Sequence, residues 1–95
     1  MPAYLIAEIE ITNPEGYTEY TKTVPATVEK YGGKFLVRGG KAHPLEGDWP
    51  ERRRVIIEFP SFAQAKAWYD SEEYRQPKAL RMRCSTGRLV FTDGV

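Results

Sequence analysis

Three absences limit what this chain can be. Cys84 is its only cysteine, which excludes an intrachain disulfide and a metal site built from several cysteines. Its 14 basic and 13 acidic residues leave a net charge of +1, a balance that gives no general attraction to nucleic-acid phosphates. The apolar stretch from Ala3 to Ile11 is interrupted by Glu8 and Glu10 and is too short to span a bilayer. We therefore expect a cytoplasmic protein without a membrane segment and without a nucleic-acid partner.

Cofactor motifs are also missing. The glycine pairs Gly32-Gly33 and Gly39-Gly40 form neither a dinucleotide-binding nor a phosphate-loop pattern. His43, Glu46 and Asp48 are close in sequence, but intervening proline and glycine argue against a helix that would align them as ligands. A haem site needs a large apolar cavity, and this segment is polar. We predict no metal and no cofactor.

What is present is a regular alternation of strand and helix patterns. Ninety-five residues are enough for one domain, which we take as residues 1–95. Apolar residues alternate with period two in four segments, 3–11, 34–38, 53–59 and 87–93. Helical spacing follows Asn13-Pro14 and again Ser61, and a short helix from Ser71 to about Cys84 is expected to break at Pro77.

This order predicts an α+β fold of the ferredoxin-like βαββαβ type. Both helical regions would cover one face of a four-stranded antiparallel sheet. The face under the helices would be cleanly apolar, whereas the opposite face mixes aliphatic and charged side chains: Ile6, Leu36, Ile56 and Val90 with Tyr4, Glu8, Arg38, Arg54, Glu58 and Arg88. Exposing each such aliphatic forfeits roughly 1.5–3 kcal/mol. We therefore expect a second copy of the chain to cover the mixed face; a solvated face with paired charges is the alternative.

Four spaced blocks resemble the DUF1330 family, a domain of unknown function. They are Arg38-Gly39-Gly40, Leu45 to Trp49, Val55 to Ser61 and Ala67 to Tyr74. The resemblance implies a dimeric α+β barrel, in which two such sheets pack face to face. The wider superfamily contains cofactor-free monooxygenases, isomerases, haem-degrading enzymes and ligand-sensing domains, so fold alone does not choose a function.

The long segment between the second and third strands carries the candidate binding residues. We predict that Arg38, Glu46, Trp49 and Arg54 bind a ligand, because long connections in small domains are usually functional. Trp49 could stack on a planar molecule or fill a groove of the partner. Arg38 and Arg54 could hold a carboxylate, or they could be neutralised within the dimer by Glu46 and Glu58.

His43 is the only histidine and the candidate catalytic acid or base. A surface role for this loop residue is the alternative. The leading functional hypothesis is a homodimer that binds a small anionic or aromatic molecule between its two sheets. The others are a cofactor-free monooxygenase- or isomerase-like enzyme that uses His43, and a structural dimer without a ligand.

Overall fold

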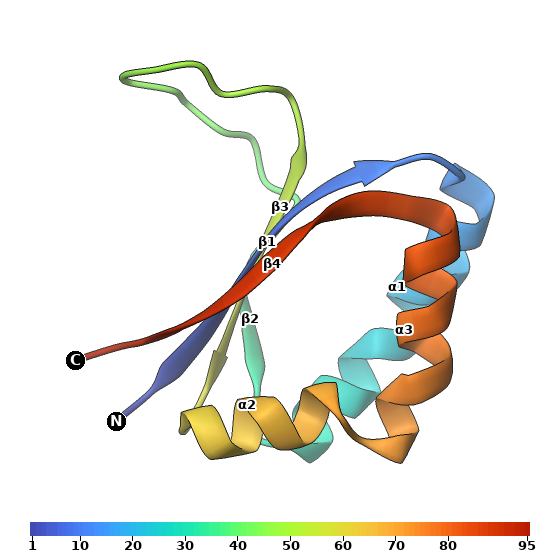
Figure 1. Cartoon of the computed structure of the whole chain (residues 1–95), viewed down its shortest axis with the longest axis vertical. Helices are drawn as coiled ribbons and strands as arrows, with labels where there is room; N and C mark the ends of the chain where they lie inside the picture. The colour runs from blue at the N-terminus through green and yellow to red at the C-terminus, as the bar shows by residue number, and fades with distance from the viewer.

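The computed structural model describes residues 1–95 and contains four strands and three helices. The strands are β1 (Ala3–Ile11), β2 (Lys34–Arg38), β3 (Arg53–Phe59) and β4 (Ser85–Asp93), and the helices are α1 (Pro14–Lys30), α2 (Phe62–Tyr69) and α3 (Glu72–Cys84). All three helices lie on the same side of the sheet (Figure 1). The predicted α+β ferredoxin-like fold with a four-stranded antiparallel sheet is confirmed.

The sheet has the strand order β2-β3-β1-β4, and every neighbouring pair is antiparallel. Leu5 of β1 lies opposite Ile57 of β3 and Phe91 of β4, so these three side chains share one face. This face points toward the helices. The register therefore follows the alternation of the sequence, because a shift by one residue would move every apolar side chain to the wrong face.

Each helix begins at a polar side chain that caps it. Asn13 accepts a hydrogen bond from the amide of Gly16, at 3.2 Å. Ser61 and Ser71 cap α2 and α3 in the same way, through the amides of residues 64 and 74 at 3.2 and 3.1 Å. A cap of this kind contributes about 1 kcal/mol.

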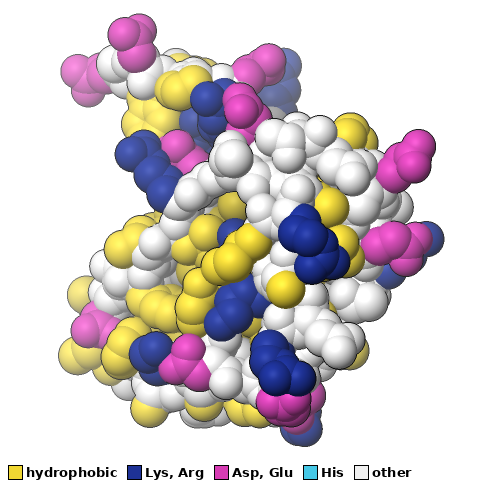
Figure 2. Space-filling view, turned by 45° about the vertical axis from the view of Figure 1, so that its right-hand side comes forward, with side chains coloured by type: hydrophobic (Ala, Val, Ile, Leu, Met, Phe, Trp, Pro, Cys, Tyr) yellow, Lys and Arg dark blue, Asp and Glu magenta, His cyan; other side chains and the backbone are white.

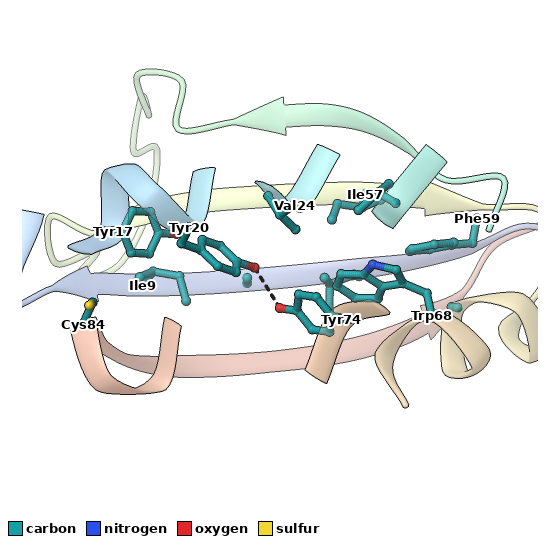
Figure 3. Close-up of a cluster of buried hydrophobic side chains, with 13 residues drawn as sticks. Ile9, Tyr17, Tyr20, Val24, Ile57, Phe59, Trp68, Tyr74 and Cys84 are labelled. Atoms are coloured by element: carbon teal, nitrogen blue, oxygen red, sulfur yellow. Dashed lines mark hydrogen bonds between the residues drawn. The ribbon is translucent and has the colours of Figure 1, made fainter. Parts of the chain in front are cut away.

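The core lies between the sheet and the helices and combines aliphatic side chains with five aromatic ones among its 13 buried residues (Figure 3). Trp68, Tyr74, Phe59 and Val28 are the largest fully buried side chains. The rings of Trp68 and Tyr74 stack with their centroids 4.1 Å apart. Burial of each of these large groups contributes roughly 1.5–3 kcal/mol, so packing of all three helices on the sheet stabilises this face. No helix combines the length and apolarity that crossing a bilayer requires.

The C-terminal part differs from the sequence prediction at two points. The expected break at Pro77 is wrong, since α3 runs without interruption from Glu72 to Cys84. Pro77 removes one backbone hydrogen bond, and burial of Tyr74 and Cys84 on the same helix offsets that loss. The last strand also begins at Ser85, directly at the helix end and two residues earlier than the alternation predicts.

The sheet face without helices is called the open face below. Ile6, Ile56 and Val90 lie on it in register, beside the charged residues Glu8, Arg54 and Arg88. The segment 39–52 between β2 and β3, called the arm, projects from the sheet on the side away from the helices (Figure 1). Its residues are exposed to solvent throughout.

Candidate functional site

The arm brings four of the five sequence-predicted site residues together. His43, Glu46 and Trp49 lie on it, and with Arg54 of β3 they line an open hollow of about 410 Å³. The indole N–H of Trp49 donates a hydrogen bond to the carbonyl oxygen of Glu46, at 2.6 Å, which fixes the ring within the arm. These four predicted residues therefore lie close together in the structure. Their role in ligand binding stays a prediction.

Arg54 has several partners on its own chain. Its guanidinium carbon lies 5.4 Å from the centroid of the Trp49 ring, a cation–π distance. One guanidinium nitrogen donates to the carbonyl oxygen of Pro50 at 2.9 Å, and Nε lies 4.0 Å from a carboxylate oxygen of Glu8. These contacts hold Arg54 against its own chain, although its Nε atom has no hydrogen-bond acceptor.

His43 is exposed on the arm and makes no hydrogen bond or ion pair with another residue. A catalytic imidazole is usually oriented by a second group that selects its tautomer. The chain itself supplies no such group at His43, so its catalytic role stays a prediction.

Arg38 is separated from the other predicted residues, and its placement on the mixed face is wrong. A β-bulge in β2 is the cause: Phe35 pairs with Ile57, but Val37 pairs with Ile56 and Arg38 with Val55. The extra residue reverses the alternation, so Arg38 shares the face of Val55, toward the helices. Its guanidinium carbon lies 4.7 Å from the centroid of the Phe35 ring.

On the helix side, Arg38 joins a pocket that the sequence analysis missed. This helix-side pocket lies between the sheet and α1, α2 and α3, and its enclosed part measures about 30 Å³, enough for one or two water molecules. Its polar lining is formed by Thr21 and three arginines, Arg38, Arg53 and Arg81. The other lining residues are Leu5, Ala7, Ile9, Tyr17, Tyr20, Val24, Phe35, Val55, Ile57, Trp68, Tyr74 and Leu89.

The arginines of this pocket have no carboxylate partner. None of the three forms an ion pair, and no aspartate or glutamate lines the pocket. Arg81 is only 6% exposed, and its Nε atom is buried without a hydrogen-bond acceptor, as are the Nε atoms of Arg53 and, on the open face, Arg54. A buried guanidinium without a carboxylate partner is costly, and the aromatic rings beside Arg38 and Arg53 leave their positive charge unneutralised. Figure 2 shows Lys and Arg side chains set among hydrophobic ones on this side of the molecule, with most acidic side chains nearer the edges.

Tyrosine hydroxyls supply the remaining polar groups. The hydroxyls of Tyr20 and Tyr74 are 2.7 Å apart and hydrogen-bonded across the helix layer (Figure 3). Burial raises the pKa of Tyr20 and of Tyr74, and also that of Tyr17, whose ring lies 5.7 Å from the guanidinium carbon of Arg53. These phenols therefore stay protonated at neutral pH and can donate hydrogen bonds to an anion.

Local structure explains how Arg53 reaches this position. Gly39 has a positive φ of 74°, and a Cβ atom there would lie 2.3 Å from a guanidinium nitrogen of Arg53. Only glycine provides both the backbone conformation and the space. The start of the arm is thus shaped to let Arg53 lie along the sheet.

A signal for Arg81 was available in the sequence. Tyr74 and Cys84 share the inward side of α3, and Arg81 lies seven residues after Tyr74, two helical turns along the same side. A charged residue at an apolar position of a helix is a sign of a buried polar site. Arg38 could not be placed in this way, because no sequence pattern predicts the bulge.

No three His, Cys, Asp or Glu side chains gather closely enough to hold a metal ion. The pocket's own chemistry is therefore that of cations and phenols: it can bind and orient an anion, and it can stabilise negative charge that develops on one.

Comparison with solved structures shows the same fold in proteins of low sequence identity. The protein of unknown function RPA0582 from Rhodopseudomonas palustris is similar with a TM-score of 0.78 and 21% identity, over 99% of this chain and 82% of that one. SnoaB from Streptomyces nogalater, a cofactor-independent oxygenase, has a TM-score of 0.68 and 8% identity, over 99% and 93% of the two chains. A putative antibiotic biosynthesis monooxygenase from Caulobacter crescentus has a TM-score of 0.62 and 16% identity, over 99% and 90%.

No curated protein matches the sequence significantly. The model of one protein family matches residues 2–95, which is nearly the whole chain. This chain therefore belongs to the DUF1330 family, described as a domain of unknown function.

Proposed function

We propose that this protein binds a small organic anion in the helix-side pocket. The observation that carries the proposal is the set of three guanidinium groups, Arg38, Arg53 and Arg81, around a pocket that contains no carboxylate. A carboxylate is the natural complement, because guanidinium groups bind it through paired, charge-assisted hydrogen bonds. Such a ligand would also offset the cost of burying Arg81.

The lining of the pocket limits the ligand to a small one. The enclosed volume of about 30 Å³ accommodates the carboxylate head alone. Arg38 is the exposed member of the lining, so the rest of the molecule would extend toward the edge strand β2. Phe35 and Tyr17 are placed to contact an apolar or aromatic body there. We therefore favour a small aromatic carboxylate or a phenol that ionises on binding.

This location differs from the space between two sheets that the sequence analysis favoured. Arg54, the arginine of the open face, already contacts Trp49, Pro50 and Glu8. The helix-side arginines have no such carboxylate partner, and this difference favours the helix side for the ligand.

We further propose that the open face pairs with a second copy of the chain. Ile6, Leu36 and Val90 are exposed there, while Glu8 and Arg54 are half-buried beside them. Apolar surface of this kind on a small domain usually marks an interface. A two-fold pairing of this face leaves the helix-side pocket open to solvent in both copies.

A thermal-shift screen tests ligand binding. Benzoate, salicylate and small aliphatic carboxylates are compared with their neutral amides, such as benzamide, at equal concentration. One-site binding at a hundred times Kd adds about 2.7 kcal/mol of stability. The proposal predicts stabilisation by acids and none by their amides. Equal thermal shifts for acids and amides, or no thermal shift with any acid, would contradict the proposed anion site.

Cofactor-free oxygenation is a second candidate. It is favoured by the positive charge of the pocket, because guanidinium groups stabilise the anion of a bound phenol or carbon acid. SnoaB is described as a cofactor-independent oxygenase, and the neighbour from Caulobacter crescentus as a putative monooxygenase. Oxygen consumption with a ligand found in the screen tests this candidate. His43 lies on the arm and not in this pocket, so His43→Ala is expected to leave that consumption unchanged, and its loss would assign the reaction to the arm instead.

A further inference from the structure

The arm and the open face have features that complement one another. Leu45, at the far part of the arm, is 96% exposed, and Trp49 is exposed to about half its surface. No backbone hydrogen bond joins the arm to the sheet beyond the one from the amide of Gly39 to the carbonyl of Arg54. An isolated chain gains nothing from presenting such apolar groups to water.

A hollow on the open face matches them in size and character. It measures about 300 Å³ and is lined by Ile6, Glu8, Arg88, Leu89 and Val90, on strands β1 and β4. No residue of the arm lines it, so within one chain the hollow and the arm do not meet. Its apolar walls and volume suit a leucine or tryptophan side chain.

The charges agree as well. Glu8 is shared by two guanidinium groups, at 3.3 Å from Arg88 and 4.0 Å from Arg54, which leaves an excess positive charge beside the hollow. The side chain of Arg88 is 84% exposed. On the arm, Glu46 and Asp48 form no ion pair within the chain. The acidic arm tip is thus complementary to the rim of the hollow.

Symmetry brings the two features together. Glu8 lies opposite both Arg54 and Arg88, so the base of the arm and the hollow are at the same level along the strands. A two-fold axis parallel to the strands, between two facing sheets, places the β2–β3 side of one copy over the β1–β4 side of the other. Rotation about this axis does not change the position of a residue along the strand direction, so the arm of one copy and the hollow of the other stay at the same height.

We infer that the arm of each copy lies across the open face of a second copy, with Leu45 in the hollow beside Val90 and the acidic tip facing Arg88. This inference rests on the dimer proposed above and specifies its contacts. The partner is a second copy of this chain, because a two-fold dimer forms two equivalent contacts, each between the arm of one copy and the hollow of the other.

Cross-linking between two single-cysteine variants tests it. A tagged Leu45→Cys chain is mixed with an untagged Val90→Cys chain, allowed to exchange, oxidised mildly and separated without reductant. The native Cys84 is buried, and the wild-type chain measures its background. Met82→Cys provides a matched control on α3, because Met82 is 58% exposed and Val90 57%.

The inference predicts at least ten-fold more cross-linked pair for Leu45→Cys with Val90→Cys than for Leu45→Cys with Met82→Cys. Equal yields from the two mixtures, in a protein that light scattering shows to be a dimer, would overturn the arm contact and leave the dimer standing. A monomer by light scattering would overturn both. Neither result bears on the helix-side pocket, which the carboxylate screen tests separately.

Discussion

At the scale of single residues, Arg81 carries most of the functional argument. It is buried on the inward stripe of α3, beside the hydroxyl groups of Tyr20 and Tyr74, and its Nε atom has no acceptor. Replacing buried charged groups with apolar residues is often neutral or stabilising. A residue kept for a ligand should therefore be dispensable for folding.

Arg81→Met is predicted to leave the free energy of unfolding within about 1 kcal/mol of the wild type, or to raise it. Chemical denaturation at neutral pH measures this, with Arg75→Met as the exposed control on the same helix. A loss of more than about 2 kcal/mol would show that Arg81 is structural.

The hydrogen bond between Tyr20 and Tyr74 predicts a coupled pair. Either single change to phenylalanine should cost about 1–3 kcal/mol, because it leaves the other buried hydroxyl without this partner. The double variant Tyr20→Phe/Tyr74→Phe should lose less than the sum of the two. A double-mutant cycle in denaturant measures the coupling, and strict additivity would contradict the bond.

At the scale of elements, Glu73 connects the two long helices. Its carboxylate pairs with Lys30, and Tyr31 donates a hydrogen bond to it at 3.0 Å. The hydrogen bond from Lys30 is the main cause that lowers the pKa of Glu73 from 4.5 to about 2. A lowered pKa in the folded state means that the carboxylate stabilises the protein when ionised.

The stability difference between wild type and Glu73→Gln is therefore predicted to be full above about pH 4.5 and to disappear as the pH falls toward 2. Denaturant titrations at several pH values measure it, with Glu72→Gln as the neighbouring control on the helix surface. A difference that stays constant from pH 6 to about 2 would show that the ion pair does not act in solution.

Alternation of apolar residues and helix-capping residues were sufficient to predict the strands and helices. The features that were not predicted depend on tertiary packing. Asn13, Ser61 and Ser71 each mark a helix start that the structure contains. The break predicted at Pro77 is absent, because the backbone hydrogen bond that proline removes is offset by packing contacts distant in sequence. The β2 bulge had a larger effect on the prediction, since one extra residue places Arg38 on the opposite side of the sheet from the one expected. For this reason the sequence did not place Arg38 in the helix-side pocket.

At the scale of the whole molecule, the two sides of the sheet have separate roles in this account. We propose that the open face, with its exposed aliphatic residues, pairs with a second copy and that the helix side holds the ligand. The protein is then expected to scatter light with twice the 10.9 kDa mass of one chain.

Val90→Glu is predicted to weaken that dimer at least ten-fold, because it places a carboxylate in an apolar interface. Met82→Glu, at an equally exposed position on α3, should have no effect on assembly. Light scattering over a dilution series measures both, and equal behaviour of the two variants would exclude the open face as the interface.

The central claim is that the ligand site lies under the helices, and calorimetric titration with benzoate tests it most directly. Wild type, Arg81→Met and Arg54→Met are titrated in parallel, since the two substitutions remove one guanidinium from opposite sides of the sheet. The account predicts one site per chain, lost or weakened at least ten-fold in Arg81→Met and unchanged in Arg54→Met. Binding that survives in Arg81→Met and is lost in Arg54→Met would place the site on the open face and contradict the account.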